Sequence, residues 1–172
     1  MTELRRPALL DASRHDREPF DSGEAVLDEW LRRYVGQNRR RDTAATWVIA
    51  DANNVVVAYA SIAITGIDRS AAPAALAKGA PDPVPALLLG RLAVDHRHTG
   101  LGIGTALAGH VLATAAELNE TAACRAVVVT ALNSKARAWW ERLGFNLFSP
   151  RADRLDLYLL TADIDATLRR LQ

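Results

Sequence analysis

The fold is decided by ALLLGRLAVDHRHTGLGIGTALAGHVLATAAEL, residues 86–118. The apolar run at 86–95 is bounded by turn residues, as in a central strand that is buried on both faces. Leu107, Val111, Ala115 and Leu118 follow at helical spacing and predict a helix with one apolar face. The stretch therefore predicts a buried strand, a short turn and a helix in direct succession.

The turn between this strand and this helix carries three glycines at alternate positions, Gly100, Gly102 and Gly104. Glycine lets the backbone turn tightly and approach a ligand closely. The amides of a helix's first turn have no partner within the helix and bind anions, so the turn predicts a site for a phosphate-containing cofactor. A Walker motif is excluded because no GK[ST] follows, and a dinucleotide motif is excluded because Thr105 stands where its third glycine belongs. A tight turn without a ligand is the alternative.

The remaining pattern predicts a single domain over residues 1–172 of the α/β class, with a mixed sheet flanked by helices. Residues 6–10 predict a short strand, and residues 46–65 predict two strands joined at Asp51–Asn54. The four prolines between Asp68 and Pro85 predict a long connection. Further along, we expect a buried strand at 125–132, a helix at 133–143 ended by Gly144, strands at 146–148 and 155–160, and a helix from about residue 162.

The first helix is predicted from an apolar pattern at positions 26, 27, 30, 31, 34 and 35, with Asp21 and Glu24 as a capping box. Its far end runs into an arginine cluster, and of the 21 basic residues in the chain only Lys78 and Lys135 are lysines. Arginine suits bidentate phosphate contacts, but the cluster is equally compatible with a solvated helix face. Both interpretations stay open at this stage.

Several classes of protein are disfavoured by composition. The net charge is +1, no apolar run reaches the length of a membrane helix, and charges interrupt residues 1–16, so we expect a cytoplasmic protein without a membrane segment. Cys124 is the only cysteine and has no ligands at metal spacing. We therefore expect neither an internal disulfide nor a metal site.

Two motifs resemble signatures of the GCN5-related N-acetyltransferase (GNAT) family. TGLGIG resembles its [QR]xxGx[GA] pyrophosphate loop, with Thr99 at the Gln/Arg place or, in another register, Arg97. NSKARAWWERLGF, residues 133–145, resembles NxxAxxxYxxxGF. The resemblance implies a mixed sheet that is splayed between two central parallel strands and binds acetyl-CoA as co-substrate. It assigns the cofactor to Leu92, Ala93 and Val94 for the pantetheine, to Thr99, Gly100, Leu101, Gly102, Ile103, Gly104 and Thr105 for the pyrophosphate, and to Asn133.

Over residues 15–165 the chain is most similar to the TacT-like acetyltransferase toxins of bacterial toxin-antitoxin pairs. The similarity is carried by FDSGEAVLDEWL, PDPVPALLLGRLAVD and SPRADRLDLYLL. It implies acetylation of the amino group of aminoacyl-tRNA, which blocks translation, a ribbon-helix-helix type antitoxin as partner, and a possible homodimer. Phosphate contacts supply much of the affinity for nucleic acid, and the candidates here are Arg32, Arg33, Arg39, Arg40, Arg41 and Arg91.

The sequence departs from the family at Trp140, which takes the place of the tyrosine that protonates the leaving thiolate. An indole N–H donates a hydrogen bond but is too weak an acid to release its proton. Trp140 is expected to face the thioester sulfur and Trp139 to pack in the core. His96 and His98 are read as solvated loop residues rather than bases, and Tyr34 and Tyr158 are substitute donors only if the fold brings them close.

Three functions remain open at this point. The first is a tRNA-directed acetyltransferase toxin, and the second is a GNAT enzyme that acts on a small amine or a protein N-terminus. The third is a catalytically weakened module that binds CoA or a partner, because Trp140 replaces the tyrosine.

Overall fold

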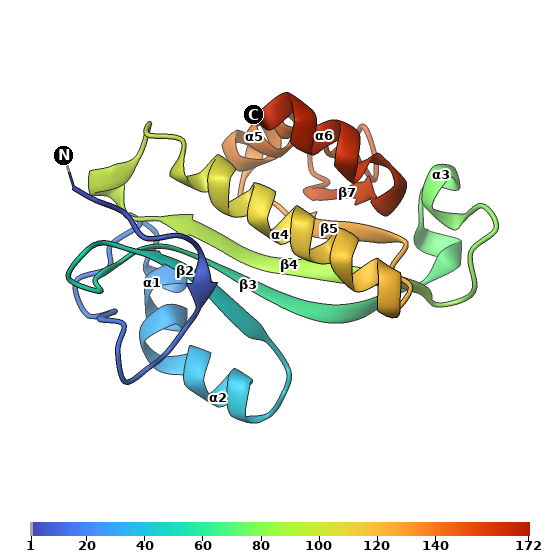
Figure 1. Cartoon of the computed structure of the whole chain (residues 1–172). Coiled ribbons are helices and arrows are strands. Elements are labelled where there is room, and N and C mark those ends of the chain that lie inside the picture. Colours follow the sequence, from blue (N-terminus) through green and yellow to red (C-terminus); the bar gives the residue numbers. More distant parts are fainter. Residues whose placement is uncertain (1) are drawn as a thin grey trace. The chain divides into compact units, whose positions relative to one another are not determined.

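The strand Val84–Val94 (β4) belongs to a seven-stranded sheet with the order β1-β2-β3-β4-β5-β7-β6. The computed structural model describes residues 2–172. β4 pairs with Ala126–Thr130 (β5) in parallel, and β5 pairs with Asp156–Leu160 (β7) in the antiparallel sense. The predicted mixed sheet with flanking helices is thus confirmed (Figure 1).

The other elements follow the predicted order. The remaining strands are β1 (Ala8–Leu9), β2 (Ala45–Ala50), β3 (Val56–Ile67) and β6 (Asn146–Leu147). The helices are α1 (Ala25–Glu29), a π-helical turn (Trp30–Tyr34), α2 (Val35–Arg40), α3 (Ala74–Ala77), α4 (Ile103–Thr121), α5 (Ser134–Leu143) and α6 (Ile164–Leu171). Short 3₁₀ turns occupy Arg69–Ala71, His96–His98 and Thr161–Asp163.

The chain forms two compact units. The first contains the residues up to Ala63 together with Gly90–His110, and the second contains Ile64–Leu89 with Val111–Gln172. Each unit has its own apolar core. The expectation of one domain over residues 1–172 stays a prediction.

Tyr59 on β3 is the centre of the core of the first unit. Its ring is fully buried, stacks on Trp30 with the ring centroids 5.7 Å apart, and meets the edge of Phe20. The hydroxyl donates to the carbonyl oxygen of Leu27 at 2.7 Å, and burial raises the pKa of this phenol well above its usual value. A buried phenol needs such a partner, so this bond fixes the first helix against the strand.

The first helix differs from its prediction in two ways. It begins at Ala25, and its N-cap is Glu24, whose side chain makes no cap hydrogen bond; the predicted capping box is therefore wrong. Asp21 instead accepts from the amide of Gly23, in the loop before the helix. In addition, Val26 and Tyr34 are 68% and 45% exposed, so only part of the apolar pattern packs in the core.

In the second unit, β4 and β5 pair from Ala86 with Ala126 to Leu89 with Val129. β4 itself continues to Val94, and its residues from Gly90 onward belong to the first unit. The predicted long connection after Asp68 contains a 3₁₀ turn and α3, whose Leu76 is completely buried. This segment is therefore part of the core and not a bare loop.

Local chemistry sets both ends of α5. The side chain of Asn133 accepts from the amide of Ala136 at the N-terminus, as expected of an N-cap. Gly144 has a φ of 120°, and a left-handed conformation at this position ends the helix as predicted.

A substitution at Gly66 tests the packing in the second unit. A Cβ at this position would lie 2.9 Å from the Cβ of Pro83. We expect Gly66→Ala to lower the free energy of unfolding by about 1–3 kcal/mol, because a backbone segment must move to admit the methyl group. Chemical denaturation measures the change.

Gly36→Ala is the matched control. Its new Cβ would meet only the end of the flexible Arg40 side chain at 3.3 Å, and alanine favours a helix interior over glycine by up to about 1 kcal/mol. An equal loss of stability in both variants would contradict the assignment of the Gly66–Pro83 contact.

Candidate functional site

The turn after β4 has the geometry of an anion site. Gly100 and Gly102 have φ values of 76° and 77°, a region that favours glycine, and α4 begins directly afterwards at Ile103. Nothing lies within 4 Å of a Cβ built at either glycine, so the turn is open. Within residues 2–172, the backbone amides of residues 100–105 donate to no other group. These amides at the positive end of a helix are therefore available to a phosphate.

Asp95, between β4 and this turn, is a buried carboxylate with four hydrogen bonds. Its Oδ1 accepts from the backbone amide of Arg97 at 2.9 Å and from Arg97 Nε at 2.8 Å. Its Oδ2 accepts from Arg97 Nη2 at 2.6 Å and from the amide of Asp21 at 3.0 Å. Burial acts to raise the pKa of Asp95, but the bonds from Arg97 and Asp21 outweigh it and hold this pKa well below its usual range.

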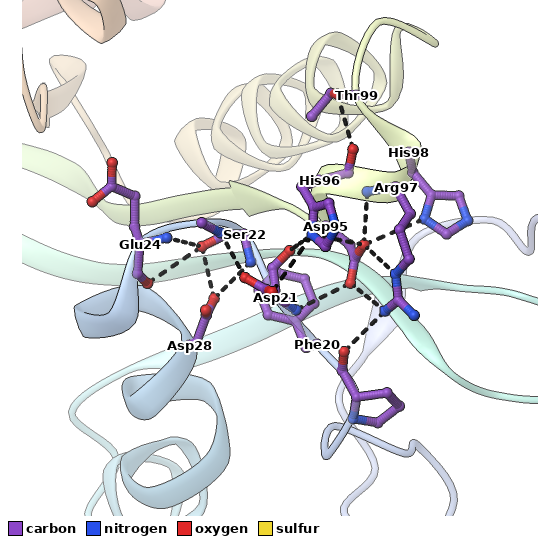
Figure 2. A network of polar contacts seen from close by, with 12 residues as sticks. Phe20, Asp21, Ser22, Glu24, Asp28, Asp95, His96, Arg97, His98 and Thr99 are labelled. Carbon is purple, nitrogen blue, oxygen red and sulfur yellow. Dashed lines mark hydrogen bonds and ion pairs between the residues drawn. The ribbon is translucent and has the colours of Figure 1, made fainter.

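This cluster joins the turn to the loop before the first helix (Figure 2). Arg97 Nη2 also donates to the carbonyl oxygen of Pro19 at 2.9 Å. The backbone amide of His96 donates to the carbonyl oxygen of Asp21 at 2.8 Å. On the other side of the loop, Ser22 donates twice to the buried carboxylate of Asp28. Two buried carboxylates thus fix the loop that leads into α1.

Sequence reasoning assigned no role to Asp95. Its partner Asp21 lies 74 residues away along the chain, and no local pattern reports such a contact. One local feature of the sequence could have indicated this ion pair: Asp95 ends an apolar strand, and Arg97 follows two residues later.

The two histidines of the turn differ from each other. The side chain of His96 is 56% exposed, as expected of a solvated loop residue, and its Nδ1 lies 2.9 Å from the carbonyl oxygen of Asp21. The side chain of His98 is only 19% exposed, and its buried Nδ1 lies 3.9 Å from Asp95 without a hydrogen bond. For His98 the expectation of a solvated side chain is therefore wrong.

The six candidate arginines differ in their surroundings. Arg32 donates to the carbonyl oxygen of Phe20 at 2.7 Å, so it has a structural partner. Two others form exposed ion pairs, Arg33 with Glu29 and Arg39 with Asp42. Arg39 and Arg40 line one hollow of the first unit, whereas Arg41 and Arg91 line another.

The remaining candidates from the second motif lie in the second unit. Asn133 is exposed and uses its side-chain oxygen as the cap of α5. Trp140 is 6% exposed and packs edge-on against Phe145 and Trp139, with ring centroids 5.0 and 4.7 Å away. Trp139 is only partly buried, so the expectation that Trp139 is the core residue of the pair is wrong. No hydrogen bond from the indole N–H of Trp140 forms within the described chain.

The substitute donors named above lie in different units. Tyr34 is 45% exposed and belongs to the first unit. Tyr158 on β7 is buried in the second, with its ring 5.5 Å from that of Phe148. In the part of the chain that the structure describes, there is no cluster of His, Cys, Asp and Glu that could hold a metal ion. The same residues include no helix that is long and apolar enough to cross a membrane.

Comparison with known proteins places this geometry in a family. The sequence profile of the acetyltransferase (GNAT) family matches residues 7–145. A tRNA-acetylating toxin of Mycobacterium tuberculosis (strain ATCC 25618 / H37Rv) is 34% identical over 153 residues, which cover 89% of this chain and 90% of that protein.

Solved structures share the fold. AtaT complexed with acetyl-methionyl-tRNAfMet matches with a TM-score of 0.85 and 24% identity, over 95% of this chain and 98% of that one. A mutant AtaT toxin bound to the C-terminus of the antitoxin AtaR and acetyl-CoA matches with a TM-score of 0.80 and 24% identity, over 95% and 97% of the two chains. The present chain belongs to the acetyltransferase (GNAT) family.

Asp95 generates a prediction about pH. We expect Asp95→Asn to lower the free energy of unfolding by about 2 kcal/mol at pH 7, because the charge-assisted bonds to the loop are lost. The ordinary pKa of an aspartate is about 3.9, and the pKa of Asp95 in the folded state is lower. The charged side chain therefore stabilises the fold fully above about pH 4, and this contribution is lost as the pH falls toward the folded-state pKa. The difference between wild type and variant should be constant from pH 7 to pH 5 and shrink below about pH 4.

Thermal unfolding across this pH range measures the difference. Asp153→Asn is the control, because Asp153 forms a solvent-exposed pair with Arg151 and such pairs contribute little. A deficit of the Asp95 variant that persists unchanged at pH 3 would show that the charge of Asp95 is not responsible.

Proposed function

We propose that this GNAT family member transfers the acetyl group of acetyl-CoA to the α-amino group of an amino acid attached to tRNA, and thereby acts as a toxin that blocks translation. The observation that carries the transfer is the open glycine turn with its unpaired amides at residues 100–105. The relative named as a tRNA-acetylating toxin supports charged tRNA as the acceptor, since the match covers nearly the whole of both chains.

The residues of the turn fit acetyl-CoA. The amides from Thr99 to Thr105 would hold the pyrophosphate, and the positive φ of Gly100 and Gly102 keeps side chains out of their path. Leu92, Ala93 and Val94 lie at the end of β4, and their backbone would pair with the pantetheine amides. Asn133 would contact the same arm. Acetyl-CoA supplies the activated acetyl thioester.

The proposed acetyl transfer requires little chemistry from the side chains of the protein. The amine of an aminoacyl ester has a lower pKa than a lysine side chain, so much of it is neutral near pH 7 and no strong base is needed. The chain contributes positioning of the two reactants and hydrogen-bond donors near the reacting carbonyl, for which the amide of Val94 is our candidate. The family motif assigns Trp140 to the departing sulfur, where its indole N–H would donate a hydrogen bond without giving up its proton.

Partners and location follow from the same proposal. A charged tRNA needs phosphate contacts, and two of the candidate arginines, Arg41 and Arg91, line the same hollow of the first unit. A structural neighbour that is a toxin bound to its antitoxin supports an antitoxin as partner. Its ribbon-helix-helix type rests on the resemblance to the TacT-like toxins. The homodimer and the cytoplasmic location stay predictions.

A catalytically weakened module is the second candidate. The observation that favours it is Trp140, whose indole is almost fully buried against Phe145 where the family motif has a tyrosine. Loss of a general acid costs about 10²–10⁴ in rate, at the lower end when the leaving group is a thiolate.

The first test uses labelled acetyl-CoA with charged total tRNA. We expect label on the aminoacyl group, removed by mild base together with the ester-linked amino acid, and no label on uncharged tRNA. Small amines and peptides with free N-termini serve as competing acceptors. Preferential labelling of those acceptors would favour the alternative GNAT enzyme, and binding of acetyl-CoA without transfer would favour the weakened module.

The second test is Trp140→Tyr. We expect kcat to rise by about tenfold or more, because a phenol both donates a hydrogen bond and releases its proton. Trp140→Phe loses the same packing volume without gaining an acid, and its kcat should not rise. Equal turnover in wild type and the tyrosine variant would remove position 140 as the limiting feature.

A further inference from the structure

The first helix presents an apolar column that the core uses only at Trp30. Val26, Trp30 and Tyr34 follow at intervals of four, and Val26 and Tyr34 are 68% and 45% exposed. The neighbouring column contains Leu31 and Val35, which are fully buried. Folding of the first unit therefore does not account for the aromatic ring of Tyr34 at the surface.

This column forms one wall of a hollow of about 630 Å³ within the first unit. The lining combines two aromatic rings with side-chain amides, a hydroxyl and two guanidinium groups. The complete set is Val26, Glu29, Trp30, Tyr34, Gln37, Asn38, Arg41, Thr43 and Arg91.

Arg91 covers the buried aromatic ring of this hollow. Its guanidinium carbon lies 4.5 Å from the centroid of the Trp30 ring, a cation–π contact. In residues 2–172 the Arg91 guanidinium has no hydrogen bond and no ion pair. Its planar donors are therefore available to a ligand, and its far side offers a flat surface for stacking.

The charge of the hollow favours an anionic ligand. Arg41 and Arg91 both line it, against a single carboxylate, Glu29. That carboxylate is already paired with Arg33 at 3.2 Å. The net charge of the lining side chains is therefore positive, and the exposed ring of Tyr34 belongs to the same lining.

Aromatic rings, guanidinium planes and phosphate-binding cations together are the means by which proteins hold unpaired nucleotides. Paired nucleotides keep their bases in the helical stack and offer no free face to Tyr34. A charged tRNA ends in unpaired nucleotides at the 3′ end that carries the amino acid.

We infer that this hollow binds the unpaired 3′ nucleotides of the charged tRNA, with a base on Tyr34 and a phosphate or base edge at Arg91. The inference rests on the proposed function for the identity of the RNA. It makes Tyr34 and Arg91 positioning residues, which hold the substrate near its reactive end, and leaves acetyl-CoA binding to the glycine turn.

The test measures direct binding of two RNA hairpins with the same stem, one blunt and one with four unpaired nucleotides at its 3′ end. We expect wild type to bind the overhang hairpin about tenfold more tightly, because stacking of a base on an aromatic side chain contributes this order of affinity. Tyr34→Ala should abolish the preference, and Tyr34→Phe should retain it. Ile64→Ala is the control, because Ile64 is 73% exposed but does not line the hollow.

Salt dependence separates stacking from charge. Tyr34→Ala should leave the slope of log affinity against log salt unchanged, whereas Arg41→Gln should weaken both hairpins and reduce the slope by about one. Binding of acetyl-CoA should be the same in all variants, which also shows that they are folded.

Equal affinity of wild type for both hairpins, or a preference that survives Tyr34→Ala, would overturn the inference. Tighter binding of an acidic peptide than of either hairpin, lost in Tyr34→Ala, would overturn it in favour of a protein partner. These readouts do not require acetyl transfer. A wild type that prefers the overhang but does not label charged tRNA would therefore support the RNA site and reject the proposed reaction, and the reverse pattern would retain the reaction and reject the site.

Discussion

The buried carboxylate of Asp95 is the constraint on which the arrangement of the first unit depends. A charge removed from water must be fully hydrogen-bonded, and Asp95 meets this need only by drawing in Arg97 and the amide of Asp21. The loop at 19–22 is therefore fixed against the end of β4, and α1 begins where that loop ends. The position of the glycine turn and the start of the first helix are consequences of one satisfied charge.

The first helix links this framework to the proposed substrate. Leu31 and Val35 pack in the core, and the helix is fixed by the bond from the Tyr59 hydroxyl to the carbonyl oxygen of Leu27. The adjacent column carries Trp30 under Arg91 and leaves Tyr34 exposed. One element thus connects the core with a surface that suits nucleic acid, within a single unit of the chain.

Much of the fold was predictable because its signals are local. The apolar run of β4, the alternate glycines and the cap residues Asn133 and Gly144 act within a few positions along the chain. The contacts of Asp95 were not predictable, since they join residues far apart. The prediction of which tryptophan is more buried, Trp139 or Trp140, was also wrong. The answer depends on which of the two rings packs against Phe145. The capping-box prediction was wrong because the Asp21 side chain accepts from the amide of Gly23 in the loop and the Glu24 side chain makes no cap hydrogen bond.

The π-helical turn at Trp30–Tyr34 has a consequence for how such a helix keeps two faces apart. In an α-helix, residues four positions apart are displaced by about 40° around the axis, so a column with a strict repeat of four winds away from its starting face. A π turn is wider and rotates each residue by less, which returns the column toward its origin. The fourfold spacing of Val26, Trp30 and Tyr34 along one hollow depends on this correction. Because a π turn holds about one residue more than an α-helical turn, deletion of one residue there would restore a regular α-helix and leave the second half of the helix on its present face.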